Sequence, residues 1–152
     1  GKAVQNVKST DGEFLHSNGE AFAASFIFGG QIGRERPRLF NIYSAGNFIE
    51  ATPDTPFLQL GEHKYGKPIL DRAVTHQTDL ESGVKLVLIS MDSTIRSNLS
   101  VGLPIDLLIA RRDVCDAELV YRIEPGDPYF HDLSERWSAA LRKRLTWSIV
   151  NG

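Results

Sequence analysis

The chain has 152 residues, enough for about one domain with a sizeable buried core. Seventeen basic and nineteen acidic side chains give a formal net charge of −2, which excludes the basic surplus typical of nucleic-acid and membrane-surface binders. No apolar run approaches the roughly 20 residues that span a bilayer. No signal peptide opens the sequence, and the single cysteine, Cys115, excludes an internal disulfide. We therefore expect one soluble, cytoplasmic domain over residues 1–152.

The first third of the chain predicts a helix and three strands. The opening residues 1–9 (GKAVQNVKS) are amphipathic, as expected of a helix. Residues 21–28 (AFAASFIF) are apolar on both faces, which predicts a strand covered on both sides. Residues 38–43 and 47–51 flank Ser44-Ala45-Gly46, a hairpin signal because glycine adopts positive φ at little cost.

Two helices are predicted after a loop rich in proline and glycine. The first covers residues 65–74. The second begins at a predicted capping box, in which the Thr78 hydroxyl and the Glu81 carboxylate bind free backbone N–H groups. Glu81 and Lys85 can form an i,i+4 ion pair. Apolar residues of this helix recur at helical spacing: Leu80, Val84, Val87, Leu88, Met91 and Ile95.

The last third predicts two strands and a closing helix. Apolar residues alternate over 103–109 and again over 119–123, as in strands. Asp127 followed by Pro128 predicts a helix N-cap with proline in the first turn. Strands grouped with strands, and helices with helices, predict an α+β layered fold instead of alternating βαβ units.

The residue types alone reveal no complete catalytic or metal site. The four histidines are scattered without metal-ligand spacing, so we expect no metal and no cofactor. Cys115 has no neighbouring histidine that would activate it as a nucleophile. Four carboxylates could act as general acids or bases, although spacing does not separate them from ordinary surface groups: Glu50, Glu62, Asp71 and Asp92.

A cluster of small polar residues lies where the long helix ends and the next strand begins. Ser97, Asn98 and Ser100 occupy this junction. Such residues commonly satisfy a helix C-terminus and the turn that follows it. The alternative is that they line a reactive site.

Three long segments resemble a known family. RLFNIYSAGNFIEATPDTPFLQLGEHKYGKPILDR, SMDSTIRSNLSVGLPIDLLIARRD and IEPGDPYFHDLSERWSAALRKRL occur in this order and are similar to Anbu, the ancestral β-subunit family of bacterial proteasome-related proteins. The resemblance covers the chain from about Ala21 onward. It implies an N-terminal-nucleophile (Ntn) hydrolase fold, a four-layer αββα sandwich, of which this chain would form the second half.

The resemblance also implies threonine peptidase chemistry. In such enzymes the hydroxyl of an N-terminal threonine is the nucleophile, and its own α-amino group acts as the base, directly or through water. An aspartate and a lysine orient that threonine. All three would lie upstream of this sequence, since Gly1 has no side chain and Thr10 falls in a predicted helix end. We therefore expect this chain to be the C-terminal two-thirds of a subunit, inactive alone.

Supporting site residues follow from the same resemblance. Proteasomal β-subunits place a small polar loop near the nucleophile, and residues 61–66 (GEHKYG) match it, with Glu62 where a serine is usual. They also carry an Asp-x-x-Ser pair at the end of the following long helix. Here Ser100 matches the serine, and either Ser97 or Asn98 replaces the aspartate.

Three functions remain open from the sequence. The first is a subunit of a self-compartmentalising threonine endopeptidase that acts on peptides or unfolded proteins. The second is a non-catalytic scaffold subunit of a proteasome-like particle, and the third is an Ntn amidohydrolase of small amides. The expected partners are copies of the chain itself in a large homo-oligomer, with no nucleic acid and no membrane.

Overall fold

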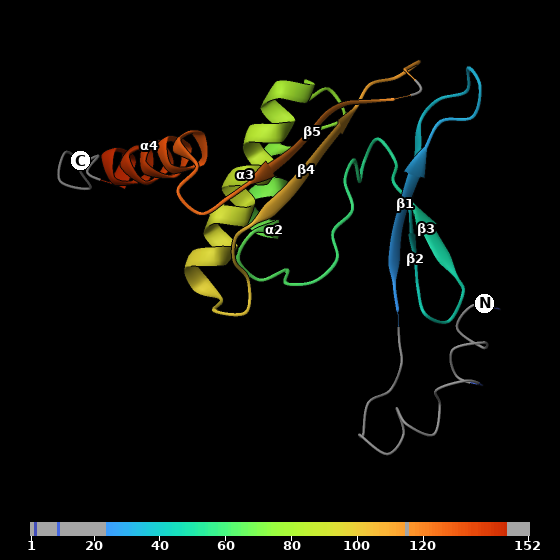
Figure 1. Cartoon of the computed structure of the whole chain (residues 1–152), viewed down its shortest axis with the longest axis horizontal. Helices are drawn as coiled ribbons and strands as arrows, with labels where there is room; N and C mark the ends of the chain where they lie inside the picture. Colours follow the sequence, from blue (N-terminus) through green and yellow to red (C-terminus); the bar gives the residue numbers. More distant parts are fainter. Residues whose placement is uncertain (1, 3–8, 10–23, 115, 146–152) are drawn as a thin grey trace, which may run out of the picture. The chain divides into compact units, whose positions relative to one another are not determined.

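The chain forms two compact units in the computed structural model, Gly1–Gly61 and Glu62–Gly152 (Figure 1). The structure describes residues 2, 9, 24–114 and 116–145. The first unit contains a three-stranded sheet, and the second contains helices and a two-stranded sheet. The mixed α and β content predicted from the sequence is thus confirmed. Of the predicted opening helix only residues 2 and 9 are described, and residues 21–23 and Cys115 lie outside the described residues.

An antiparallel sheet forms the first unit, in the order β1-β2-β3. Its strands are β1 (Phe26–Gly30), β2 (Arg38–Ile42) and β3 (Phe48–Glu50). The β2–β3 turn contains Gly46 at φ 91°, a conformation that favours glycine. The predicted hairpin is therefore confirmed, with Phe40 of β2 paired to Glu50 of β3.

The apolar residues of β1 are exposed on both faces. Phe26, Ile27 and Phe28 retain 57%, 42% and 63% of their accessible surface. The prediction that this strand is covered on both sides is therefore wrong for the chain as it stands. An apolar run shows that a strand needs cover, but it does not show which polypeptide supplies that cover.

The second unit places a β-hairpin along a long helix (Figure 1). Its elements are α2 (Lys67–Ala73), α3 (Leu80–Ser97), β4 (Ile105–Ala110), β5 (Ala117–Ile123) and α4 (Pro128–Leu145). Strands β4 and β5 pair antiparallel. The hydrophobic core is built from Leu88 of α3, Ile123 of β5 and Phe130 of α4, each at most 8% exposed.

The two helix caps differ in how well the sequence predicted them. Asp127 is confirmed as the cap of α4, since its carboxylate accepts the Phe130 N–H at 2.9 Å. Thr78 is wrong as the cap of α3. Asp79 takes that place and accepts the Ser82 N–H at 2.9 Å, because the Thr78 hydroxyl already accepts the Thr75 N–H at 2.8 Å.

Helix α2 approaches α3 closely at its first turn. Gly66, the N-cap of α2, is buried, and a Cβ built on it would lie 2.7 Å from the Ser90 carbonyl oxygen and 2.7 Å from the Thr94 hydroxyl. A side chain at this position would therefore push the two helices apart. This packing fixes the loop before α2 relative to α3, which matters for the site described next.

Candidate functional site

The polar junction at the end of α3 is centred on Asn98. This residue is the helix C-cap, and its backbone N–H donates to the Thr94 carbonyl at 2.9 Å. Its side-chain carbonyl accepts the Ser100 N–H at 2.9 Å, and its backbone carbonyl accepts the Val101 N–H at 3.1 Å. Asn98 therefore ends the helix and organises the turn that follows, as the turn interpretation predicts.

Asn98 also makes a contact that turn chemistry does not require. Its side-chain Nδ2 donates to Glu62 Oε2 at 2.9 Å, across a separation of 36 residues. Glu62 lies in the loop before α2, where its other oxygen accepts the backbone N–H of Lys64 at 2.7 Å. The structure thus joins two of the residues that the sequence singled out.

The Glu62 carboxylate is held in its ionised form. The Lys64 N–H lowers the pKa of Glu62 most strongly, and the Asn98 amide lowers it further against a partial desolvation that raises it. A half-buried carboxylate that stays ionised can accept hydrogen bonds from an ammonium group or orient a hydroxyl. Oε2 of Glu62 accepts its hydrogen bond from the uncharged Asn98 amide, so the Glu62–Asn98 pair carries one negative charge.

Ser97 and Ser100 contribute less than the sequence suggested. Both are exposed. Ser100 joins the site through its backbone N–H, whereas Ser97 makes no side-chain hydrogen bond to any described residue. Of the two candidates for the replaced aspartate, Asn98 is therefore the one that contacts Glu62.

The other carboxylates considered as acids or bases are engaged in ion pairs. Glu50 binds Arg38 and Arg36 at the edge of the first sheet, and Asp71 binds Lys67 along α2 at 2.6 Å. Residues spaced i,i+4 on a helix, or opposite each other on paired strands, commonly form such ion pairs, so these pairs give no evidence of a catalytic role. Neither residue lies in a cluster of three or more potential metal ligands, and the described part of the chain contains no such cluster.

Asp92 belongs to a buried polar network that the sequence analysis missed. It is 7% exposed, and its Oδ1 accepts the hydroxyl of Ser134 from α4 at 2.7 Å. Arg96 donates to Asp92 at 3.2 Å and to Ser134 at 2.6 Å. The sequence signal was present, because Asp92 and Arg96 are spaced i,i+4 and Ser134 interrupts an apolar stripe. This network joins α4 to α3, and its Asp92 lies six residues before Asn98.

None of the described helices has the length and apolar character needed to cross a membrane.

Comparison with solved structures gives close matches, whereas no protein-family model and no curated protein matches the chain. Anbu from Hyphomicrobium sp. strain MC1 is 53% identical with a TM-score of 0.85, over 97% of this chain and 59% of that one. Anbu (ancestral beta-subunit) from Yersinia bercovieri is 43% identical with a TM-score of 0.83, over 99% and 64%.

A third match is the helical assembly of the Anbu complex from Pseudomonas aeruginosa. It is 48% identical with a TM-score of 0.80, over 95% of this chain and 62% of that one. The chain therefore spans about three fifths of the length of these structures.

Proposed function

Since the chain belongs to the Anbu family over the part of the subunit that it spans, we propose that it is part of a threonine-type, N-terminal-nucleophile peptidase that acts on peptides or unfolded proteins. Under this proposal residues 1–152 form one domain, the second half of an αββα sandwich. The nucleophilic threonine and its aspartate and lysine partners lie outside these residues, and the chain alone is inactive.

The observation that carries the proposal is the hydrogen bond between Glu62 and Asn98. The resemblance expects a hydroxyl in the loop and a carboxylate at the helix end. In this chain the carboxylate comes from the loop and the uncharged donor comes from the helix end. The pair thus retains one carboxylate and one hydrogen-bond partner at the same two places, with their roles exchanged.

The proposed chemistry is proton transfer from the hydroxyl of a threonine to its own α-amino group. The hydroxyl of an N-terminal threonine needs a base, and its own α-amino group can take the proton. An ionised carboxylate near that amino group stabilises the ammonium form that results. We assign this role to Glu62, with Asn98 and the Lys64 N–H fixing the carboxylate orientation and Ser100 as a neighbouring hydroxyl.

Self-assembly is part of the same proposal. The Pseudomonas aeruginosa match is described as a helical assembly. The chain also leaves large apolar side chains exposed, among them Phe28 at 63% and Leu108 at 64%, which favours further cover. We propose that copies of the subunit form a large cytoplasmic homo-oligomer, without nucleic acid, membrane or cofactor.

The test is covalent labelling of the protein as its gene encodes it with a peptide epoxyketone, followed by peptide mapping. The proposal expects one adduct on an N-terminal threonine. Glu62→Gln should slow labelling by about 10- to 100-fold, because it removes the negative charge proposed to stabilise the ammonium form. Glu124→Gln, which changes an exposed glutamate paired with Arg122, is the control and should label normally.

The competing functions give different results in the same experiment. Particles that form without any labelled threonine would support the scaffold. Labelling and turnover of small amides without peptide cleavage would support the amidohydrolase.

A further inference from the structure

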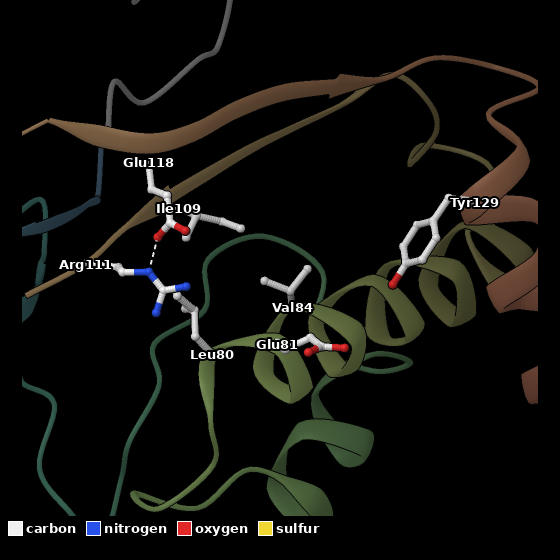
Figure 2. Close-up of a pocket in the computed structure, with 7 residues that line it drawn as sticks. All are labelled: Leu80, Glu81, Val84, Ile109, Arg111, Glu118 and Tyr129. Carbon is white, nitrogen blue, oxygen red and sulfur yellow. Dashed lines mark ion pairs between the residues drawn. The ribbon is translucent and has the colours of Figure 1, made fainter.

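A shallow groove of about 250 Å³ lies between the start of α3 and the far end of the β4–β5 hairpin (Figure 2). Its apolar surface comes from Leu80 and Val84 of α3 and from Ile109 of β4. Leu80 is 39% exposed, although the pattern of α3 predicts it on the packed side. This apolar stretch therefore lacks cover from the described residues.

Two glutamates and one arginine are the charged residues that line the groove. Glu81 pairs with Lys85 at 2.6 Å yet keeps 81% of its side chain exposed. Glu118 pairs with Arg111, so the residues lining the groove carry one net negative charge. Figure 2 shows the Arg111–Glu118 pair at one end and Tyr129 of α4 at the other. An occupant with an apolar side chain beside a cation would match this lining.

The end of α4 has the complementary chemistry. The apolar stripe of α4 is buried at Phe130, at 8% exposure, but it continues to Leu141, which is 46% exposed. Figure 1 shows this helix running beyond the end of its contact with α3. Arg142 and Lys143 follow Leu141 and are exposed, and Arg142 has no ion pair with any residue that the structure describes.

The groove and the helix end of one chain cannot meet each other. Tyr129 in the first turn of α4 lines the groove, and Leu141 lies twelve residues further along the same helix. At 1.5 Å per residue this places Leu141 about 18 Å from the groove. A contact between the two surfaces therefore requires a second copy.

We propose that the end of α4, from Leu141 to Lys143, docks in this groove of a neighbouring copy, with Leu141 against Val84 and Ile109. Arg142 then lies beside the Glu81 and Glu118 carboxylates, which gives register and specificity through complementary charge. The contact joins two different surfaces, so repeating it produces a ring or an open helix instead of a closed dimer. This inference rests on the self-assembly proposed above and names its contact.

Sedimentation velocity of the protein as its gene encodes it tests the contact. Glu81→Lys in the groove and Arg142→Glu in the helix end should each weaken self-association by about 10- to 100-fold, because each places like charges together. An equimolar mixture of the two variants should regain assembly, because each reversed surface then meets an opposite charge. Leu141→Asp provides a second variant that removes the apolar anchor and should weaken assembly without changing the groove.

The controls repeat the charge changes away from the groove. Asp71→Lys breaks another i,i+4 pair on α2, and Arg72→Glu reverses an exposed charge at the end of the same helix. Both should assemble like the wild type. Thermal unfolding of every variant checks that each is folded.

Three outcomes would overturn the inference. If the charge reversals assemble like the controls, the groove is not the contact, although the proposed self-assembly stands. If single variants weaken assembly but their mixture does not restore it, the two surfaces do not meet. If reversals lower only the melting temperature, another part of the same subunit covers the groove. A wild type that remains monomeric would overturn both this inference and the proposed assembly.

Discussion

The two units of the chain hold together in different ways. The second unit has a buried core in which Leu88 is 1% exposed and Ile123 is 2% exposed. The sheet of the first unit relies on backbone pairing and edge contacts, while Phe28 and Phe48 are each 63% exposed. Large apolar side chains therefore contribute to stability very differently in the two units, because the contribution depends on how much of the side chain is buried.

The largest expected effect compares the two units directly. Leu88→Ala should lower the free energy of unfolding of the second unit by about 2–5 kcal/mol, because it leaves a cavity in the core. Phe28→Ala should cost less than about 1 kcal/mol, since that ring is mostly exposed. Urea unfolding followed by circular dichroism measures both, and equal losses would show that burial does not separate the two units.

Adding a Cβ at three glycines should affect stability to different extents. Gly66→Ala should cost about 3 kcal/mol, because the added Cβ meets the Ser90 backbone carbonyl, which cannot move aside. Gly29→Ala in β1 should cost far less, since the one close approach of its Cβ is to the end of the flexible Leu39 side chain at 2.8 Å, and the Arg38 carbonyl oxygen lies at an ordinary 3.5 Å. Gly83→Ala in α3 has nothing within 4 Å and should stabilise by about 0.5–1 kcal/mol.

Removing a polar contact should likewise cost more stability in the second unit than in the first. Ser134→Ala removes the hydroxyl that binds the buried Asp92 carboxylate and should cost about 1–2 kcal/mol. Arg38→Ala removes an exposed pair with Glu50 at the edge of the first sheet and should cost less than Ser134→Ala, because solvent screens the pair. Equal costs in thermal unfolding would show that the α3–α4 network is not a structural anchor.

The smallest effect is a pH dependence shared by both units. Hydrogen bonds from Arg38 and from the Lys64 N–H lower the pKa of Glu50 and of Glu62, respectively, below 4.5. A lowered carboxyl pKa contributes stability that is fully present above pH 4.5 and is lost as the pH falls through the folded value.

Carbon-detected NMR titration should therefore show both carboxyl groups titrating below 4.5. Asn98→Ala should raise the pKa of Glu62 and leave that of Glu50 unchanged. A Glu62 that titrates at its ordinary value would contradict the ionised form assigned to it.

Local signals in the sequence predicted most of the secondary structure. Gly46 marked the β2–β3 turn and Asp127 marked the start of α4, because each depends only on adjacent residues. The α3 cap was placed one residue early, since Thr78 and Asp79 can both cap a helix. The Thr75 N–H, which binds Thr78, decides between them.

Long-range contacts were less accessible. The Glu62–Asn98 bond joins residues 36 positions apart with no shared periodicity, so only the family resemblance brought both residues into view. The Ser134–Asp92 contact was missed because a serine within an apolar stripe does not reveal its partner. The exposure of β1 could not be predicted. Its apolar sequence shows that the strand favours burial on both faces, but not which polypeptide segment would bury it.

The central claim is that Glu62 and Asn98 support a threonine nucleophile supplied by the same subunit. Intact-mass measurement with Edman sequencing of the mature protein, purified as its gene encodes it, tests this claim most directly. The first residue of the mature chain should be a threonine. Any other residue at that position would contradict the role assigned to Glu62 and Asn98, regardless of the oligomeric state.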